Sequence, residues 1–162
     1  MKKLYLIRHA KSSWEDITLD DFERPLNKRG EKDAPLMGKL LDRKNITADI
    51  IISSPSKRTI QTVKLITQQL QSTVEIIYND NLYETTLDGL EKVIKNIDNK
   101  YESVYLFGHN PSLNSFVEKY INMDENIPTC GVVGIEFDCD SWKKLEPKVA
   151  TKLFFEYPKL YR

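Results

Sequence analysis

Residues 3–14 read KLYLIRHAKSSW, an apolar run that stops at Arg8 and His9. The run 3–7 combines aliphatic and aromatic residues over the length of a strand, and it predicts a β-strand with a charged end. A cationic pair there can simply face solvent at the edge of a sheet, or it can hold an anion such as phosphate. Similar segments elsewhere in the chain bear on which interpretation is right.

Short apolar runs of the same kind alternate with segments whose apolar residues recur at helical spacing. The predicted strands cover residues 3–7, 49–53, 74–78 and 103–107. The predicted helices cover residues 28–43, 60–70, 87–97 and 113–121. Pro35 interrupts the first of these helices and is expected to mark where its regular part begins. The alternation predicts one α/β domain over residues 1–162, a three-layer sandwich with helices on both faces of a mainly parallel sheet.

The last part of the chain has a different pattern. Residues 131–138 and 152–157 form two apolar runs, and the segment between them lacks a clear helical pattern. These runs are expected to add strands to the sheet, including an antiparallel one at an edge.

The charge balance and the cysteine count exclude several classes of function. Lys and Arg together number 24, as do Asp and Glu, so the chain lacks the basic surplus typical of nucleic-acid binding. No apolar run is long enough to cross a membrane, and the four-residue run before Arg8 is too short for a signal peptide. Cys130 and Cys139 are too far apart for a zinc or redox motif and are expected to be reduced thiols. We therefore expect a cytoplasmic protein without nucleic-acid or membrane partners.

Two strand-to-helix junctions share one construction. Ser54-Pro55 follows the second predicted strand, and Asn110-Pro111 follows the fourth. Ser and Asn favour the N-cap position, and proline favours the first helical position, so each pair predicts a helix N-terminus. Such a terminus offers unpaired backbone N–H groups and the positive end of the helix dipole to an anion.

The chain has only two histidines, His9 and His109, and each lies just after a predicted strand. In an open α/β sheet the ligand crevice lies at the carboxyl ends of the strands. Four side chains are expected to meet there: Arg8, His9, Ser54 and His109. Taken singly, each histidine could be a half-buried structural residue, but the repeated position at strand ends favours a functional pair.

Two further side chains are placed to act at the same crevice. Arg58 lies on the first turn of the helix after Ser54, where its guanidinium can bind phosphate oxygens, although helical arginines are often simply solvated. Glu84 precedes the helix 87–97 and could donate a proton to a leaving group, although an acidic residue there also suits the helix dipole. The sequence leaves both alternatives open.

Together these residues predict phosphoryl transfer through a covalent intermediate. A neutral His9 would attack phosphorus, and Arg8, Arg58 and His109 would hold the phosphate oxygens. The neighbouring charge of Arg8 disfavours protonation of the imidazole and keeps its lone pair available. The sequence has neither an aspartate cluster nor a glycine-rich nucleotide loop, so neither a metal ion nor a cofactor is expected.

These residues stand in an ordered set of motifs that resembles the histidine phosphatase superfamily. The set comprises LIRHAKS at 6–12, DFERPLNKRG at 21–30, SSPSKRTIQT at 53–62, NLYE at 81–84 and FGHNP at 107–111. The tail SWKKLEPKVATKLFF at 141–155 is similar as well, and the closest resemblance is to phosphohistidine phosphatases of the SixA type. The resemblance implies a phosphoglycerate-mutase-like fold.

The resemblance also implies roles for single residues. It implies that His9 becomes phosphorylated and that Arg8, Arg58 and His109 complete the phosphate pocket. Glu84 matches the superfamily's usual proton donor. Members that cleave phosphohistidine need this acid less, because imidazole is already a good leaving group.

Three further residues are candidates for contacts with the substrate: Lys11, Arg24 and Asn110. Lys11 could instead be solvated, and Arg24 could anchor the loop before Pro25. Ala10 stands where many members of the superfamily have glycine, which narrows the backbone freedom beside the nucleophile.

The spacing between Glu84 and Phe107 leaves no room for a cap domain over the pocket. An open pocket can accept a phosphorylated side chain that projects from a protein, so we expect phosphohistidine on proteins as the substrate. One alternative is a phosphomonoesterase or mutase that acts on a small phosphoester through the same histidine. A non-catalytic phosphate-binding module is the less favoured alternative.

Overall fold

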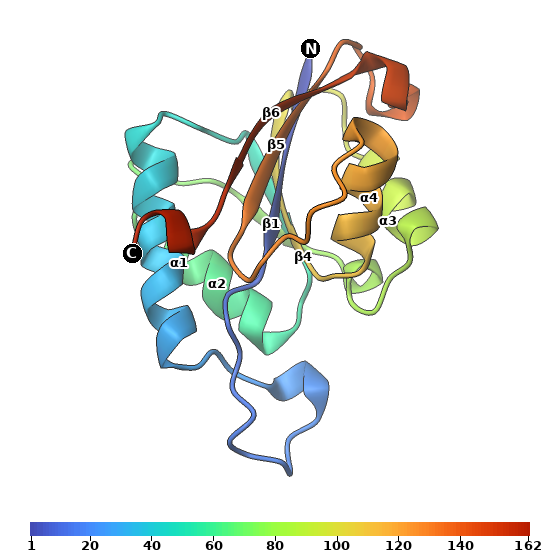
Figure 1. The fold of residues 1–162 in the computed structure, drawn as a ribbon. Helices are drawn as coiled ribbons and strands as arrows, with labels where there is room; N and C mark the ends of the chain where they lie inside the picture. Colours follow the sequence, from blue (N-terminus) through green and yellow to red (C-terminus); the bar gives the residue numbers. More distant parts are fainter.

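A six-stranded β-sheet forms the middle layer of the structure, with helices on both of its faces (Figure 1). The structure is a computed structural model that describes all 162 residues. The strands are β1 (Lys2–Arg8), β2 (Ile50–Ser53), β3 (Ile76–Tyr78), β4 (Ser103–Gly108), β5 (Val132–Phe137) and β6 (Ala150–Glu156). The helices are α1 (Lys28–Arg43), α2 (Lys57–Thr67), α3 (Leu87–Lys95) and α4 (Ser112–Ile121). Short 3₁₀ helices are η1 (Asp21–Glu23), η2 (Asp80–Leu82), η3 (Trp142–Lys144), η4 (Pro147–Val149) and η5 (Pro158–Leu160).

The strand order is β3-β2-β4-β1-β5-β6, and β1 to β4 run parallel. The predicted α/β sandwich around a mainly parallel sheet is confirmed. The antiparallel strand, however, is β5, which lies inside the sheet rather than at an edge. The edge strand β6 is antiparallel to β5 and therefore points the same way as β1. The segment before β5 explains this direction. The N–H of Cys130 donates to the carbonyl of His9 at 2.9 Å, so β5 starts beside the carboxyl end of β1 and runs antiparallel to it.

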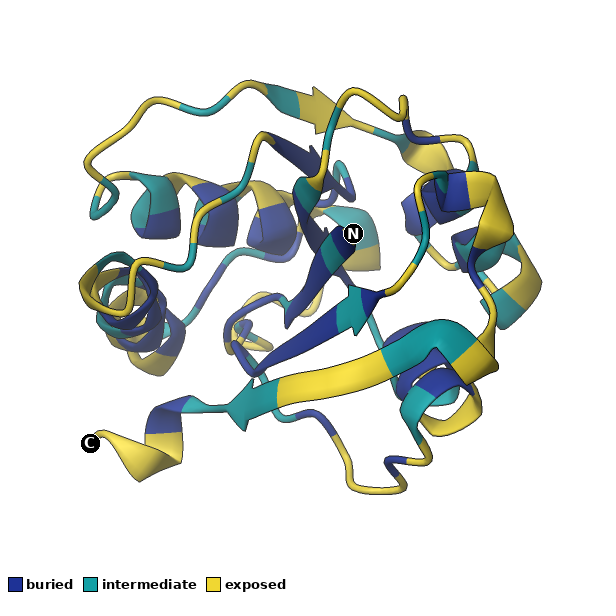
Figure 2. Cartoon of the chain, turned by 90° about the horizontal axis from the view of Figure 1, so that it is seen from above, coloured by how far each residue is buried: buried dark blue, intermediate teal, exposed yellow.

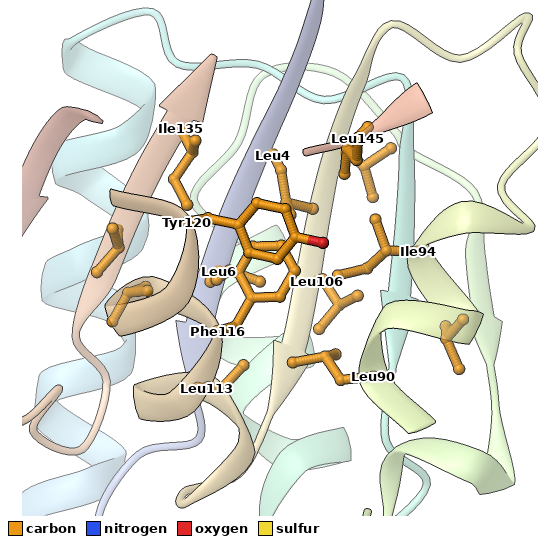
Figure 3. Packing of buried hydrophobic residues seen from close by; sticks show 14 of the residues in the cluster. Leu4, Leu6, Leu90, Ile94, Leu106, Leu113, Phe116, Tyr120, Ile135 and Leu145 are labelled. Carbon is orange, nitrogen blue, oxygen red and sulfur yellow. The ribbon is translucent and has the colours of Figure 1, made fainter. Parts of the chain in front are cut away.

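Alternate residues of each strand are buried on opposite faces of the sheet. In β1, Leu4 and Leu6 pack with residues of α3 and α4, whereas Tyr5 and Ile7 pack with residues of α1 and α2. Figure 3 shows the first of these two cores, with Phe116 of α4 lying over the strands. Seen from above, the buried parts of the helices face the sheet (Figure 2). Burial on both faces explains the nearly continuous apolar runs, and each buried leucine contributes about 1.5–3 kcal/mol.

Helix α1 begins and ends where the sequence pattern predicts. Asn27 caps it, because its side chain accepts a hydrogen bond of 2.9 Å from the backbone N–H of Gly30. Pro35 lies inside the helix and does not mark its start, contrary to our expectation. A proline there removes one backbone donor, but the buried side chains of Ala34 and Met37 hold the helix against the sheet.

The expectation that Ser54 and Asn110 are N-caps is wrong, since α2 begins after Ser56 and α4 begins after Pro111. The Oγ of Ser54 instead accepts a hydrogen bond of 3.3 Å from the N–H of Ser56, in the turn before the helix. The Oδ1 of Asn110 accepts one of 3.2 Å from the N–H of Asn114, inside α4. Both side chains therefore close the turn between strand and helix, because the chain uses one or two more residues to reverse direction than the sequence pattern suggests.

No further domain is inserted between Glu84 and Phe107, where the regular elements are α3 and β4. Both cysteines are free thiols; Cys130 is buried and Cys139 is half-buried. A cytoplasmic location remains a prediction. None of the four helices combines the length and apolar character that crossing a membrane requires.

Candidate active site

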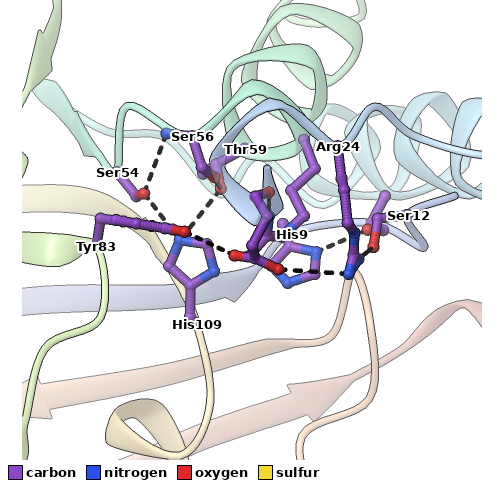
Figure 4. Close-up of polar contacts among 11 residues, drawn as sticks. His9, Ser12, Arg24, Ser54, Ser56, Thr59, Tyr83 and His109 are labelled. Carbon is purple, nitrogen blue, oxygen red and sulfur yellow. Dashed lines mark hydrogen bonds and ion pairs between the residues drawn. The ribbon is translucent and has the colours of Figure 1, made fainter. Parts of the chain in front are cut away.

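Two histidines meet at the carboxyl edge of the parallel strands. Neighbouring strands β1 and β4 pair with Arg8 opposite Gly108, so the residues that follow, His9 and His109, emerge side by side. The centroids of the two rings are 5.1 Å apart, and His9 is only 7% exposed. The structure therefore brings together two side chains that lie 100 positions apart in the sequence (Figure 4).

The backbone beside His9 decides which of its ring nitrogens is protonated. The Nδ1 atom lies 2.8 Å from the carbonyl oxygen of Ala10, and because a carbonyl can only accept, Nδ1 carries the proton. The Nε2 atom then keeps its lone pair. The N–H of Ala10 donates to the Oγ1 of Thr62 at 2.9 Å, which fixes this turn against α2.

Both imidazoles are uncharged near neutral pH. Burial lowers the pKa of His9 to about 3, and the positive charges of Arg58 and Arg8 act in the same direction. The hydrogen bond to the carbonyl of Ala10 opposes this shift without outweighing it. Burial also lowers the pKa of His109 to about 4, again with a contribution from Arg58. An uncharged imidazole can act as a nucleophile or donate a hydrogen bond to an anion.

His109 is oriented by groups from two other segments. Its Nε2 lies 2.8 Å from the Oγ of Ser54 and 3.5 Å from the Oγ1 of Thr59. The ring of Tyr83 meets it edge-on, with centroids 5.7 Å apart. These contacts position the ring beside His9.

Arg58 reaches the same place from the first turn of α2. Its Nη1 donates to the backbone oxygen of Asp21 at 2.7 Å, and its Nη2 donates to the Oδ2 of the same residue at 3.0 Å. The hydroxyl of Tyr83 also donates to this Oδ2, at 2.7 Å. Partial burial raises the pKa of Asp21, but the hydrogen bonds from Tyr83 and Arg58 lower it by more. The pKa of the carboxyl therefore lies below its usual value. Asp21 is therefore a carboxylate bound to the guanidinium.

Two more arginines lie around the histidines. Arg8 donates from Nη1 to the carbonyl of Ile127 at 3.0 Å. Arg24 donates from Nη2 to the hydroxyl of Ser12, and its Nη1 lies 3.4 Å from the Oδ1 of Asp21. Burial, followed by repulsion from the neighbouring cation at position 58, lowers the pKa of both guanidinium groups.

Arg8, Arg24 and Arg58 share one further property. In each of them the Nε–H is buried and has no acceptor within the protein. A buried donor without an acceptor is unfavourable, and three cations with a single carboxylate between them leave a surplus of positive charge. The surroundings of the two histidines are therefore built for an anion with several acceptor oxygens, such as phosphate.

The other candidates lie further out. The side chain of Lys11 is exposed and makes no hydrogen bond or ion pair. Asn110 donates to the carbonyl of Ile127 at 3.0 Å and so supports the segment that also binds Arg8.

Glu84 directly follows Tyr83, whose ring contacts His109. It is exposed, has a φ of 54° and makes no side-chain hydrogen bond. It lines a separate groove of about 890 Å³ between β2, β3 and α3, to which neither His9 nor His109 contributes. Tyr83 lies between the two places, since it lines the groove and also contacts His109.

Sequence reasoning missed Asp21 and Tyr83. Both lie within quoted motifs, Asp21 in DFERPLNKRG and Tyr83 in NLYE. Neither has a local signal for its role, because an aspartate in a short turn and a tyrosine in a loop are common. Their meeting at Arg58 depends on three segments that only the fold brings together.

The comparisons with known proteins agree with this geometry. The family model described as "Histidine phosphatase superfamily (branch 1)" matches residues 4–117, a range that contains both histidines and Arg58. An uncharacterized chloroplastic protein of Arabidopsis thaliana is 28% identical over 152 residues, which cover 88% of this chain and 70% of that protein. Phosphoserine phosphatase 1 of Hydrogenobacter thermophilus is 36% identical over 86 residues, 52% of this chain and 39% of that protein.

Solved structures resemble the whole chain. A candidate phosphohistidine phosphatase SixA from Agrobacterium tumefaciens has a TM-score of 0.84 and 26% identity, with 97% of this chain and 98% of that chain covered. The protein histidine phosphatase SixA in complex with tungstate has a TM-score of 0.83 and 16% identity, with 99% of each chain covered. Because the tungstate complex is only 16% identical to this chain, its resemblance concerns the fold alone.

Proposed function

The chain belongs to the histidine phosphatase superfamily and is a phosphatase of that fold, and we propose that it works through a phosphohistidine intermediate on His9. We further propose that its substrate is phosphohistidine on a protein. One observation carries the first part of this proposal: the carbonyl of Ala10 holds the proton on Nδ1 of His9 and leaves the lone pair on Nε2.

The reaction has two displacements at phosphorus. The Nε2 of His9 forms a bond to phosphorus while the bond between phosphorus and the substrate imidazole breaks, and the departing imidazole takes a proton from solvent. Water then attacks the phosphorus of phosphorylated His9 and the bond between phosphorus and Nε2 breaks, so that inorganic phosphate is released and the imidazole of His9 is regenerated. Arg8, Arg58 and His109 stabilise the phosphate oxygens in both steps, and each well-aimed donor contributes about 3 kcal/mol.

Two observations favour a phosphorylated histidine as the substrate. The pocket has no cap domain, so a side chain that projects from a protein can enter it. Glu84, the expected acid, is exposed and its side chain forms no hydrogen bond that would hold it in place. A site whose acid is not held in place suits imidazole better than an alkoxide, because imidazole leaves more easily.

A small phosphoester is the second candidate substrate. The matched relatives include phosphoserine phosphatase 1 of Hydrogenobacter thermophilus, which is 36% identical over its matched part. A small molecule can also enter a pocket that has no cap.

Assays with the chain of 162 residues test the proposal directly. We expect the chain to cleave a phosphohistidine peptide faster than a phosphoserine peptide or 3-phosphoglycerate, with the same rate after treatment with EDTA. Rapid quenching should trap an acid-labile, base-stable phosphate on His9, and His9→Ala should abolish turnover while the circular dichroism spectrum and melting temperature stay close to those of the wild type. Unchanged turnover in His9→Ala would contradict the covalent route, and faster cleavage of 3-phosphoglycerate would select the small-molecule alternative. If the protein binds phosphate but turns over none of these substrates, it is a non-catalytic phosphate-binding module.

A further inference from the structure

Residues 14–23 form a loop that projects from the body of the protein beside the two histidines; we call it the projecting loop (Figure 1). Its base is held by backbone pairing, because Ser12 and Leu26 form an antiparallel bridge and the N–H of Ser13 donates to the carbonyl of Pro25 at 2.8 Å. The loop is therefore a defined element whose two ends are tied together.

The projecting loop exposes large apolar side chains. The exposed fractions are 69% for Trp14, 91% for Ile17 and 37% for Leu19. Single exposed apolar residues are ordinary, but three within six positions on one projecting segment are typical of a surface that binds another molecule.

The projecting loop also carries negative charge and no positive charge. Its five acidic residues are Glu15, Asp16, Asp20, Asp21 and Glu23, all at exposed positions. Asp21 is bound to Arg58, which leaves four carboxylates turned to solvent. Such a surface attracts a basic partner and repels a small, free phosphate compound.

Both ends of the projecting loop contact the site. The indole of Trp14 lies over the guanidinium of Arg24, 3.4 Å from the ring centroid. At the other end, Phe22 packs edge-on against Tyr83, with centroids 5.0 Å apart, and Tyr83 contacts His109. The loop is thus continuous with the wall of the pocket, so a macromolecule with a side chain inserted toward the histidines would lie against it.

From this continuity we propose that the projecting loop docks the substrate protein, and that this protein surrounds its phosphorylated histidine with apolar and basic residues. The inference rests on the proposed function and adds to it the chemistry of the partner's surface. Ile17 and Leu19 would be buried in the complex, and the four solvent-exposed carboxylates would pair with lysine or arginine of the partner.

Two probes and two pairs of variants test the proposal. The probes are a core histone phosphorylated on histidine with phosphoramidate, which is basic and macromolecular, and free phosphohistidine. Ile17→Ser should lower kcat/KM for the phosphohistone about tenfold, through a higher KM, and change that for free phosphohistidine less than twofold. Its control is Leu153→Ser, because Leu153 on β6 is 41% exposed but lies outside the loop.

The second pair addresses charge. Glu15→Lys should lower kcat/KM for the phosphohistone about fivefold and weaken its dependence on salt, whereas Glu118→Lys on α4 should have no effect. If Ile17→Ser and Glu15→Lys both match the wild type on the phosphohistone, the docking proposal is wrong although the proposed function stands. If the wild type cleaves neither probe, the proposed substrate is wrong and the docking proposal falls with it.

Discussion

Arg58 and Asp21, 37 positions apart in the sequence, are joined by two hydrogen bonds, one to the backbone oxygen and one to the carboxylate. The guanidinium is almost fully buried, while the carboxylate is half-exposed. The contact ties the first turn of α2 to the projecting loop and determines the direction in which Arg58 presents its remaining N–H donors. Asp21 is therefore a positioning residue for the arginine.

Replacing Asp21 with Asn should reduce activity through the loss of this positioning. We expect kcat/KM for free phosphohistidine to fall about tenfold to a hundredfold, because a small displacement of a binding group is costly for the reaction. Asp20→Asn is the control, since its exposed side chain forms no cap hydrogen bond with the same turn. Higher activity in Asp21→Asn would instead mean that the carboxylate competes with phosphate for Arg58.

Thr62→Val should weaken both stability and catalysis. The Oγ1 of Thr62 accepts a hydrogen bond from the N–H of Ala10, whose carbonyl orients His9. Valine has nearly the same shape but leaves this buried N–H without an acceptor, which should lower the free energy of unfolding by about 1–3 kcal/mol. Urea unfolding and kcat together check the prediction, with Thr67→Val as the control because its hydroxyl bonds only within α2. If Thr62→Val is destabilised but keeps the kcat of the wild type, the hydrogen bond between Thr62 and Ala10 stabilises the turn without orienting the imidazole of His9.

The stability of the protein should fall in mild acid because of its two histidines. The pKa values of His9 and His109 are about 3 and about 4 in the folded chain, below about 6.5 in the unfolded chain. Below pH 6.5 the unfolded chain therefore binds protons that the folded chain does not, and the free energy of unfolding decreases as the pH falls toward 4.

His109→Gln isolates one of these two contributions. Between pH 7 and pH 5 the variant should lose about 2 kcal/mol less stability than the wild type, as measured by urea unfolding at both values. The carboxylate of Asp21 does not interfere, since its lowered pKa places its titration below this range. An equal loss of stability in both proteins would show that His109 is not buried in its uncharged form.

Glu84→Gln should leave the cleavage of phosphohistidine within about twofold of the wild type. The side chain is exposed and makes no hydrogen bond, and imidazole needs little help to leave. Parallel assays with an alkyl phosphate ester give the contrast. A selective loss of activity on the ester would make Glu84 an acid used for alkoxide leaving groups, and a loss on both substrates would contradict the prediction.

Much of the fold follows from the sequence, because short-range patterns carry it. Strands buried on both faces must be apolar almost throughout, so the runs ending at Arg8 and near Gly108 were readable as strands. Parallel strands end at a common edge, and this predicted that His9 and His109 would approach each other. Arg58 was also predicted on the first turn of its helix, and it lies there although that helix begins after Ser56 and not after Ser54.

The tertiary structure alone decided how the loops meet around those residues. Asp21, Tyr83 and Arg58 converge through side-chain contacts between segments far apart in the sequence, for which no periodicity exists. The sequence also predicted Glu84 as an acid at the pocket, and in the structure its side chain is exposed and forms no hydrogen bond. Local sequence patterns indicate which residues of a segment are buried. The contacts of an exposed loop depend instead on where the folded chain places the two ends of that loop, which is a property of the whole fold.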